Sequence, residues 1–140
     1  MNREQALAIR TSTLEKGTWE GQFEGQDDTD IRKFASQIMD LNPIHHDEEF
    51  AKTVVGLDAI VATGVRIMGF ASSMVGNALP GGMIYKINEI TFPKPLYAGV
   101  PVLVRCRIAH YRHPLVKVHV AVIIGDGNVG ECTCTVALPR

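Results

Sequence analysis

The sequence lacks an excess of charge of either sign and contains few cysteines. Its 14 Lys and Arg residues face 15 Asp and Glu residues, which gives a net charge of -1. With so little net charge, no overall field attracts nucleic acid or an anionic membrane, and we expect neither as a partner. Cys132 and Cys134 lie two residues apart on a predicted strand, where their side chains share one face instead of forming a metal-type pair. We therefore expect reduced thiols in the core and no metal site.

A secretory signal and an uninterrupted apolar run are also missing. Residues Met1 to Arg10 are polar and carry acids as well as bases, so they offer neither the apolar stretch nor the cleavage site of a signal peptide. The longest apolar stretch, Ala59 to Leu79, is interrupted by Arg66 and Asn77, which favours a buried helix over a membrane span. The sequence thus predicts a cytoplasmic protein with no membrane segment.

Internal repeats, low-complexity tracts and flexible linkers are absent as well. The 140 residues match the commonest size of one domain. A content of 46% hydrophobic and 21% charged residues is ordinary for a soluble globular chain. We predict that residues 1–140 form a single domain around one continuous core.

The first part of the chain predicts a strand, a helix and a rigid loop. Residues Thr18 to Phe23 are typical of a short strand. A helix capped by Thr29 or Asp30 follows, because its apolar residues recur with a period of 3.6, and it should end near Asp40. Pro43 then lacks an amide donor and disfavours helical backbone in the residue before it, which predicts a loop.

The rest of the chain predicts one long buried helix and a sheet. After a brief helical turn from Asp47 through Lys52, the stretch from Thr63 to Leu79 is almost entirely apolar or small, as in a helix enclosed on several sides. Short turns between the later runs predict that sequential strands are antiparallel neighbours. We expect an α+β domain in which the sheet wraps around the helix. The four predicted strands are Met83 to Phe92, Val102 to His110, Val116 to Ile124 and Glu131 to Leu138.

The stretch from Asp40 to His45 has the composition of an acid/base site. It reads Asp-Leu-Asn-Pro-Ile-His, so a carboxylate and an imidazole flank a loop stiffened by proline. Proton transfer to or from a reacting molecule needs such groups within hydrogen-bond reach of one another or of a shared water. Histidine changes charge near neutral pH, and a neighbouring aspartate can orient its ring or hold a proton.

This stretch resembles the signature of MaoC-like dehydratases and (R)-specific enoyl-CoA hydratases. The matching pattern is F-x5-D-L-N-P-I-H-x-D, from Phe34 to Asp47. Further along, Ile60 to Val65 stands where the family has I-V-H-G-M, and Leu79-Pro80-Gly81 matches its L-P-G. The resemblance runs roughly from Thr18 to Leu138 and implies a hot-dog fold, in which a curved antiparallel sheet holds a long central helix.

The resemblance also implies an activity and roles for five residues. Asp40 and His45 would activate the water that adds to C3 of a trans-2-enoyl thioester, and one of them would protonate C2 to give an (R)-3-hydroxyacyl thioester. A backbone amide near Gly64 would stabilise the enolate oxygen, while Asn42 and Ser72 would support the pair. The substrate would be carried by coenzyme A or acyl carrier protein, as in fatty acid metabolism. The family implies no cofactor or metal, and a homodimer whose sheets pair edge to edge.

Three positions depart from the family pattern. Met39 stands where a small or acidic residue is common, Thr63 replaces a histidine, and Val100 replaces an acid. Each change can reshape the pocket. Arg66 lies within the apolar helix, where an arginine either reaches an interface or a ligand phosphate, or extends its charged end to solvent.

Other functions and other residue roles remain open from the sequence alone. A hot-dog thioesterase, which hydrolyses the thioester, and a non-catalytic subunit that binds acyl thioesters are the two alternatives. Ser72 could bond only to its own helix. We expect His46 to be an exposed loop residue, since adjacent histidines point in different directions, and we assign no role to His110, His113 or His119.

Overall fold

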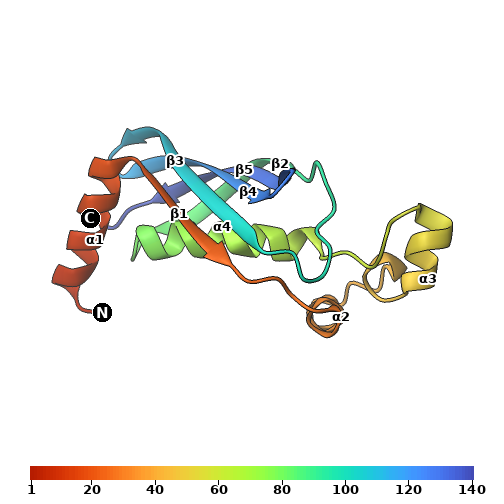
Figure 1. Ribbon diagram of the computed structural model, residues 1–140. Coiled ribbons are helices and arrows are strands. Elements are labelled where there is room, and N and C mark those ends of the chain that lie inside the picture. Colours follow the sequence, from red (N-terminus) through yellow and green to blue (C-terminus); the bar gives the residue numbers. More distant parts are fainter.

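The computed structural model describes all 140 residues and shows a curved antiparallel sheet packed on one long helix (Figure 1). Five strands form the sheet in the order β1-β3-β4-β5-β2. The expected α+β architecture is therefore confirmed. The strands are β1 (Thr18–Phe23), β2 (Met83–Thr91), β3 (Val102–Arg112), β4 (Leu115–Ile124) and β5 (Gly127–Ala137).

The long helix α4 (Gly64–Ala78) lies along the inner face of the sheet. Ile67, Phe70 and Val75 of this helix are buried against inward-facing side chains of the strands. Thr63 caps the helix at its start and Leu79 at its end, so the limits predicted from the sequence are confirmed. Because α4 is enclosed by the sheet, its first turn is held in a fixed place, and the site described below is built around that turn.

The order of the strands differs from the sequence prediction at one place. Strand β2 pairs with β5, not with its successor β3, and the partner of β3 on that side is β1. The ten residues from 92 to 101 form no regular strand, and this length lets the chain cross to the other side of the sheet. The prediction of sequential neighbours was correct only for β3, β4 and β5, whose connections are tight turns.

A helix that we did not predict, α1 (Arg3–Lys16), precedes β1. It buries none of its residues, so it has little of the apolar periodicity that reveals an amphipathic helix. Its caps are the local signal: Asn2 and Gln5 form a capping box, and Gly17 ends the helix with a φ of 73°. Thr13 donates from its hydroxyl to the carbonyl of Ala78, so α1 satisfies the C-terminal end of α4.

The other short helices lie at the opposite end of the molecule, beyond the N-terminus of α4 (Figure 1). Helix α2 (Asp28–Gln37) is capped by Asp27, two residues before the expected Thr29 and three before Asp30. The 3-10 turn η1 (Pro43–His45), the short α3 (Glu48–Phe50) and the π-turn η2 (Ala51–Val55) follow. As expected, Asp47 caps the brief helical turn.

The cysteines lie in the core, as the sequence predicted, and all three are free. Burial raises the pKa of the Cys106 thiol to about 12, so this group stays protonated at neutral pH. Among the helices, none is both long and apolar enough to cross a bilayer.

Candidate active site

The loop that carries Asp40 begins with a residue in the left-handed region. After α2 ends, Met39 has a φ of 60°. Its amide donates to the carbonyl of Ser36 at 3.1 Å, and the amide of Asp40 donates to the carbonyl of Ala35 at 2.9 Å. These are the two bonds of a Schellman helix end, whose left-handed position normally favours glycine. Asp40 thus leaves the helix in a fixed direction.

Asn42 shapes the turn between the two candidate catalytic residues. Its side-chain oxygen accepts a hydrogen bond from the amide of Ile44 at 3.3 Å and caps η1. Its backbone amide donates to Oδ1 of Asp40 at 3.1 Å. Asn42 therefore contacts the carboxylate through its main chain, and its side chain holds the turn that points His45 back toward Asp40.

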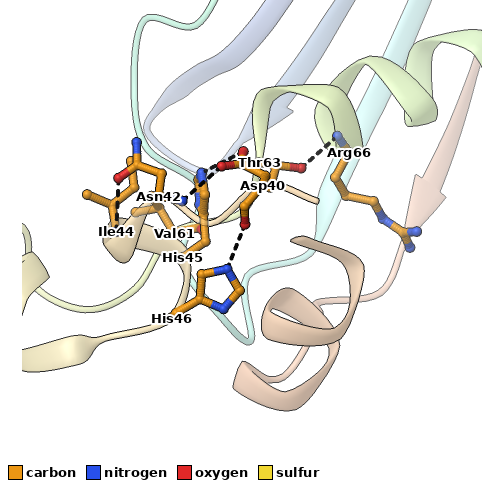
Figure 2. Close-up of polar contacts among 8 residues, drawn as sticks. All are labelled: Asp40, Asn42, Ile44, His45, His46, Val61, Thr63 and Arg66. Atoms are coloured by element: carbon orange, nitrogen blue, oxygen red, sulfur yellow. Dashed lines mark hydrogen bonds and ion pairs between the residues drawn. The ribbon is translucent and has the colours of Figure 1, made fainter. Parts of the chain in front are cut away.

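The side chains of Asp40 and His45 come together (Figure 2). His45 Nε2 lies 3.4 Å from Asp40 Oδ2, and the two side chains are 7% and 34% exposed. His45 Nδ1 lies 2.7 Å from the carbonyl oxygen of Val61. Because a carbonyl can only accept, Nδ1 carries a proton, and in the neutral form of the ring Nε2 is an acceptor that faces the carboxylate.

When the ring is neutral and the carboxylate ionised, this arrangement places two hydrogen-bond acceptors side by side. A neutral Nε2 and an ionised carboxylate cannot bond to each other without a proton between them. One water molecule can donate one hydrogen to each, which would hold the water in place and make its oxygen a better nucleophile. The pair has the geometry for general acid/base chemistry on a water.

The segment before α4 ties this pair to the helix. The amide of Val61 donates to the carbonyl of Ile44 at 3.1 Å, and its carbonyl accepts from the His45 ring. Two hydrogen bonds therefore join this segment to η1. On its other side the segment pairs with the 96–97 region, where Ala62 donates to the carbonyl of Leu96 at 2.9 Å. The imidazole is therefore fixed relative to the start of α4.

The first turn of α4 presents free amides next to this segment. Thr63, which is 2% exposed, accepts from the amide of Arg66 at 3.1 Å through its side chain and so serves as the N-cap. Among the hydrogen bonds of the chain, none has the amide of Gly64 or Val65 as donor. The threonine that departs from the family pattern thus preserves a capped helix start whose dipole and amides favour negative charge.

Gly64 is glycine because of packing. A Cβ at this position would lie 2.7 Å from the ring of Phe92, closer than any real contact. The Phe92 ring therefore packs against the start of α4.

Two of the other sequence expectations need correction. Ser72, which we expected to support the pair, is exposed on α4, and no hydrogen bond joins it to Asp40 or His45. His46, expected to be exposed, is half-buried, and its Nε2 lies 2.7 Å from the carbonyl oxygen of Asp40. The only sequence signal for this bond was its place directly after His45.

The main cavities of the chain lie away from the pair. The largest, of about 780 Å³, lies against β1, β3 and β4, and includes Thr18, Arg105 and His119. None of the five main cavities is lined by Asp40 or His45. The pair therefore lies outside the main cavities of a single chain.

Comparisons with known proteins concern the fold and the family of the chain. The (R)-specific enoyl-CoA hydratase of Rhodospirillum rubrum is 38% identical over 73 residues, which cover 51% of this chain and 50% of that protein. The match thus spans about half the length of this curated relative. The solved ChsH1-ChsH2 complex from Mycobacterium tuberculosis has a chain with a TM-score of 0.78 at 21% identity, covering 86% of this chain and 94% of that one.

The (R)-hydratase from A. caviae involved in PHA biosynthesis has a similar fold. Its TM-score is 0.75 at 20% identity, over 86% of this chain and 95% of that one. At this identity the likeness shows a shared fold, the hot-dog fold that the sequence predicted. A family model described as a MaoC like domain matches residues 4–124. The chain therefore belongs to the family of MaoC-like domains.

Proposed function

We propose that the protein is an (R)-specific hydratase/dehydratase that interconverts trans-2-enoyl-CoA thioesters and (R)-3-hydroxyacyl-CoA thioesters. The observation that carries this proposal is the pair of acceptors, His45 Nε2 and Asp40 Oδ2, at 3.4 Å from each other. The name of the Rhodospirillum rubrum relative, an (R)-specific enoyl-CoA hydratase, supports the same reaction class.

In the hydration direction, Asp40 and His45 hold one water by accepting its two hydrogens. The water oxygen forms a bond to C3 of the enoyl group, while one of its protons passes to the pair. The electrons of the C2–C3 double bond move toward the thioester carbonyl, and the pair returns a proton to C2. The balance is one water added, and the protein ends in its starting protonation state.

The amide of Gly64 is the proposed donor to the thioester oxygen. Negative charge develops on this oxygen as C3 is attacked, and the free amides at the start of α4 carry the positive end of the helix dipole. In other enzymes, the loss of one such oxyanion donor costs about 3 kcal/mol of transition-state stabilisation. The fixed segment from Val61 to Gly64 keeps this donor at a constant position relative to the His45 ring.

We further propose that two copies of the chain pair through β2. This strand is one edge of the sheet, and its exposed side chains include Met83, Tyr85 and Ile90. The other edge, β1, exposes only polar residues. An unpaired edge strand with exposed apolar side chains favours pairing with another strand, and a second chain would add walls around Asp40 and His45. Pairing with a different homologue is the other outcome, since one similar structure is a complex of two different chains.

The direct test is an assay with crotonyl-CoA. The purified protein should add water and give (R)-3-hydroxybutyryl-CoA, identified by chiral analysis of the product. Asp40→Asn and His45→Gln should each lower kcat by about 10² or more, because an amide side chain cannot take a proton from the water. Full activity in both variants would reject the assignment of these residues.

The same samples separate the two alternatives. Release of free CoA thiol from a saturated acyl-CoA, without hydration of crotonyl-CoA, would identify a thioesterase. Binding of acyl-CoA without either reaction would identify a non-catalytic subunit.

A further inference from the structure

A residue next to the proposed catalytic pair contacts the backbone of Asp40. His46 Nε2 lies 2.7 Å from the carbonyl oxygen of Asp40 (Figure 2). Because the carbonyl can only accept, Nε2 carries the hydrogen and the ring acts as the donor. The two adjacent histidines point in different directions, and yet both end at Asp40: His45 faces the carboxylate and His46 binds the main chain.

His46 is itself held at its main chain. Its amide donates to the carbonyl of Pro43 at 3.0 Å. Its carbonyl accepts from Nε of Arg32, on α2, at 3.1 Å. The imidazole is thus attached to a backbone that is fixed both to η1 and to the helix preceding Asp40, so it can hold Asp40 against that helix.

Asp40 needs such a contact because the residue before it is strained. Met39 has a left-handed backbone that L side chains disfavour. The amide of Asp40 is held by Ala35, and its carbonyl is held by His46. Without the second bond, Asp40 keeps only its amide anchor and the contact from Asn42 to its carboxylate. A small shift of the loop would then move Oδ2 away from His45 Nε2.

We propose that His46 is a positioning residue, which keeps the Asp40 carboxylate in register with His45 by donating to the Asp40 carbonyl. The proposal rests on the proposed hydratase function. His46 acts through Asp40 and does not contact the reacting atoms. Its loss should therefore lower kcat and leave KM largely unchanged, since displacement of a catalytic group by about 1 Å can cost up to 10²-fold in rate.

Two substitutions at this position separate the hydrogen bond from packing. His46→Leu keeps a side chain of similar bulk and removes the donor. His46→Gln places an amide NH₂ near the position of Nε2 and keeps the donor. His110→Leu is the matched control, since it makes the same replacement at an exposed position of β3. For crotonyl-CoA hydration, we expect His46→Leu to lower kcat about tenfold with KM changed less than twofold. His46→Gln should return kcat to within about twofold of the native value.

Amide hydrogen exchange, followed by NMR, provides a readout that needs no activity. In His46→Leu the amides of Asp40 and Asn42 should exchange about tenfold faster, while the amides of α4 keep their native rates. Native exchange together with native kcat in His46→Leu would overturn the proposal, as would an equal loss of kcat in the Leu and Gln variants. If the native protein fails to hydrate crotonyl-CoA, the proposed function fails, and the exchange rates still decide whether His46 holds Asp40.

Discussion

At the scale of single residues, Met39 gives the site loop a left-handed backbone that residues with a Cβ disfavour. Its φ of 60° costs a residue with a Cβ about 1 to 2 kcal/mol relative to glycine. Its side chain is 78% exposed, so burial of the side chain offsets little of this backbone cost. The backbone at Met39 is therefore strained. The hydrogen bonds from the amides of Met39 and Asp40 to Ser36 and Ala35 keep it in this conformation.

Replacing Met39 by glycine should stabilise the protein. The relief of strain exceeds the extra freedom that glycine gains in the unfolded chain, so the free energy of unfolding should rise by about 1 kcal/mol. Urea denaturation measures the change. Met39→Ala is the control, because it shortens the side chain and keeps the Cβ. Equal stability of the Gly and Ala variants would show that the left-handed backbone is not the cause.

The sequence predicted Asp40 and His45 as the reacting pair, because the residue pattern and the proline between them are local. The hydrogen bond from His46 to Asp40 could not be predicted, since it depends on how the loop folds back after η1. Likewise, Thr63 looked like the loss of a family histidine until the helix start placed it as an N-cap.

At the scale of elements, Arg66 connects α2 to α4. Its guanidinium carbon lies 5.3 Å from the centre of the Phe34 ring, on α2, and 5.1 Å from that of Phe70, on α4. Its Nε and Nη2 both lie 3.0 Å from the Gln26 side-chain amide, when the oxygen of that amide faces them. The half-buried arginine that interrupted the apolar stretch thus links the helix that leads to Asp40 with the helix that begins at Gly64.

Arg66→Met should destabilise the protein by about 2 kcal/mol. The substitution keeps much of the aliphatic bulk and removes two cation–π contacts and two hydrogen bonds. Arg66→Lys keeps the charge but cannot donate two hydrogen bonds in one plane. Its free energy of unfolding should therefore lie between those of the native protein and the Met variant. Urea denaturation of all three proteins gives the order. A Met variant as stable as the native protein would mean that the arginine does not join the helices.

The elements themselves differ in how far the sequence predicts them. Helix α4 and strand β1 were predicted within a residue, because apolar periodicity and stop signals are local. Helix α1 was missed, since it buries no residue and only its caps mark it. The pairing of β2 with β5 was also missed, because it joins segments about fifty residues apart and no turn between them encodes it.

At the scale of the whole molecule, the Asp40–His45 pair lies outside the main cavities of a single chain, and the edge strand β2 exposes apolar side chains. A second chain that pairs with β2 and covers the Asp40–His45 pair would explain both features. We expect the protein to sediment as a dimer. Tyr85→Lys, which places a charge on the exposed edge, should shift it toward monomer and lower hydration of crotonyl-CoA at the same time.

Tyr111→Lys is the control for this experiment, because Tyr111 is an exposed tyrosine on β3. It should leave both the assembly and the activity unchanged. A native protein that sediments as a monomer and is fully active would show that one chain completes the site alone.

The most direct test of the account is a comparison of kcat/KM for crotonyl-CoA among the native protein, Asp40→Asn, His45→Gln and the double variant. If both side chains hold the same water, each single substitution should cost about 10² or more, and the double should be little worse than either single, because the pair acts as a unit. Native rates in either single variant, or losses that multiply in the double, would contradict the claim that Asp40 and His45 act on one water.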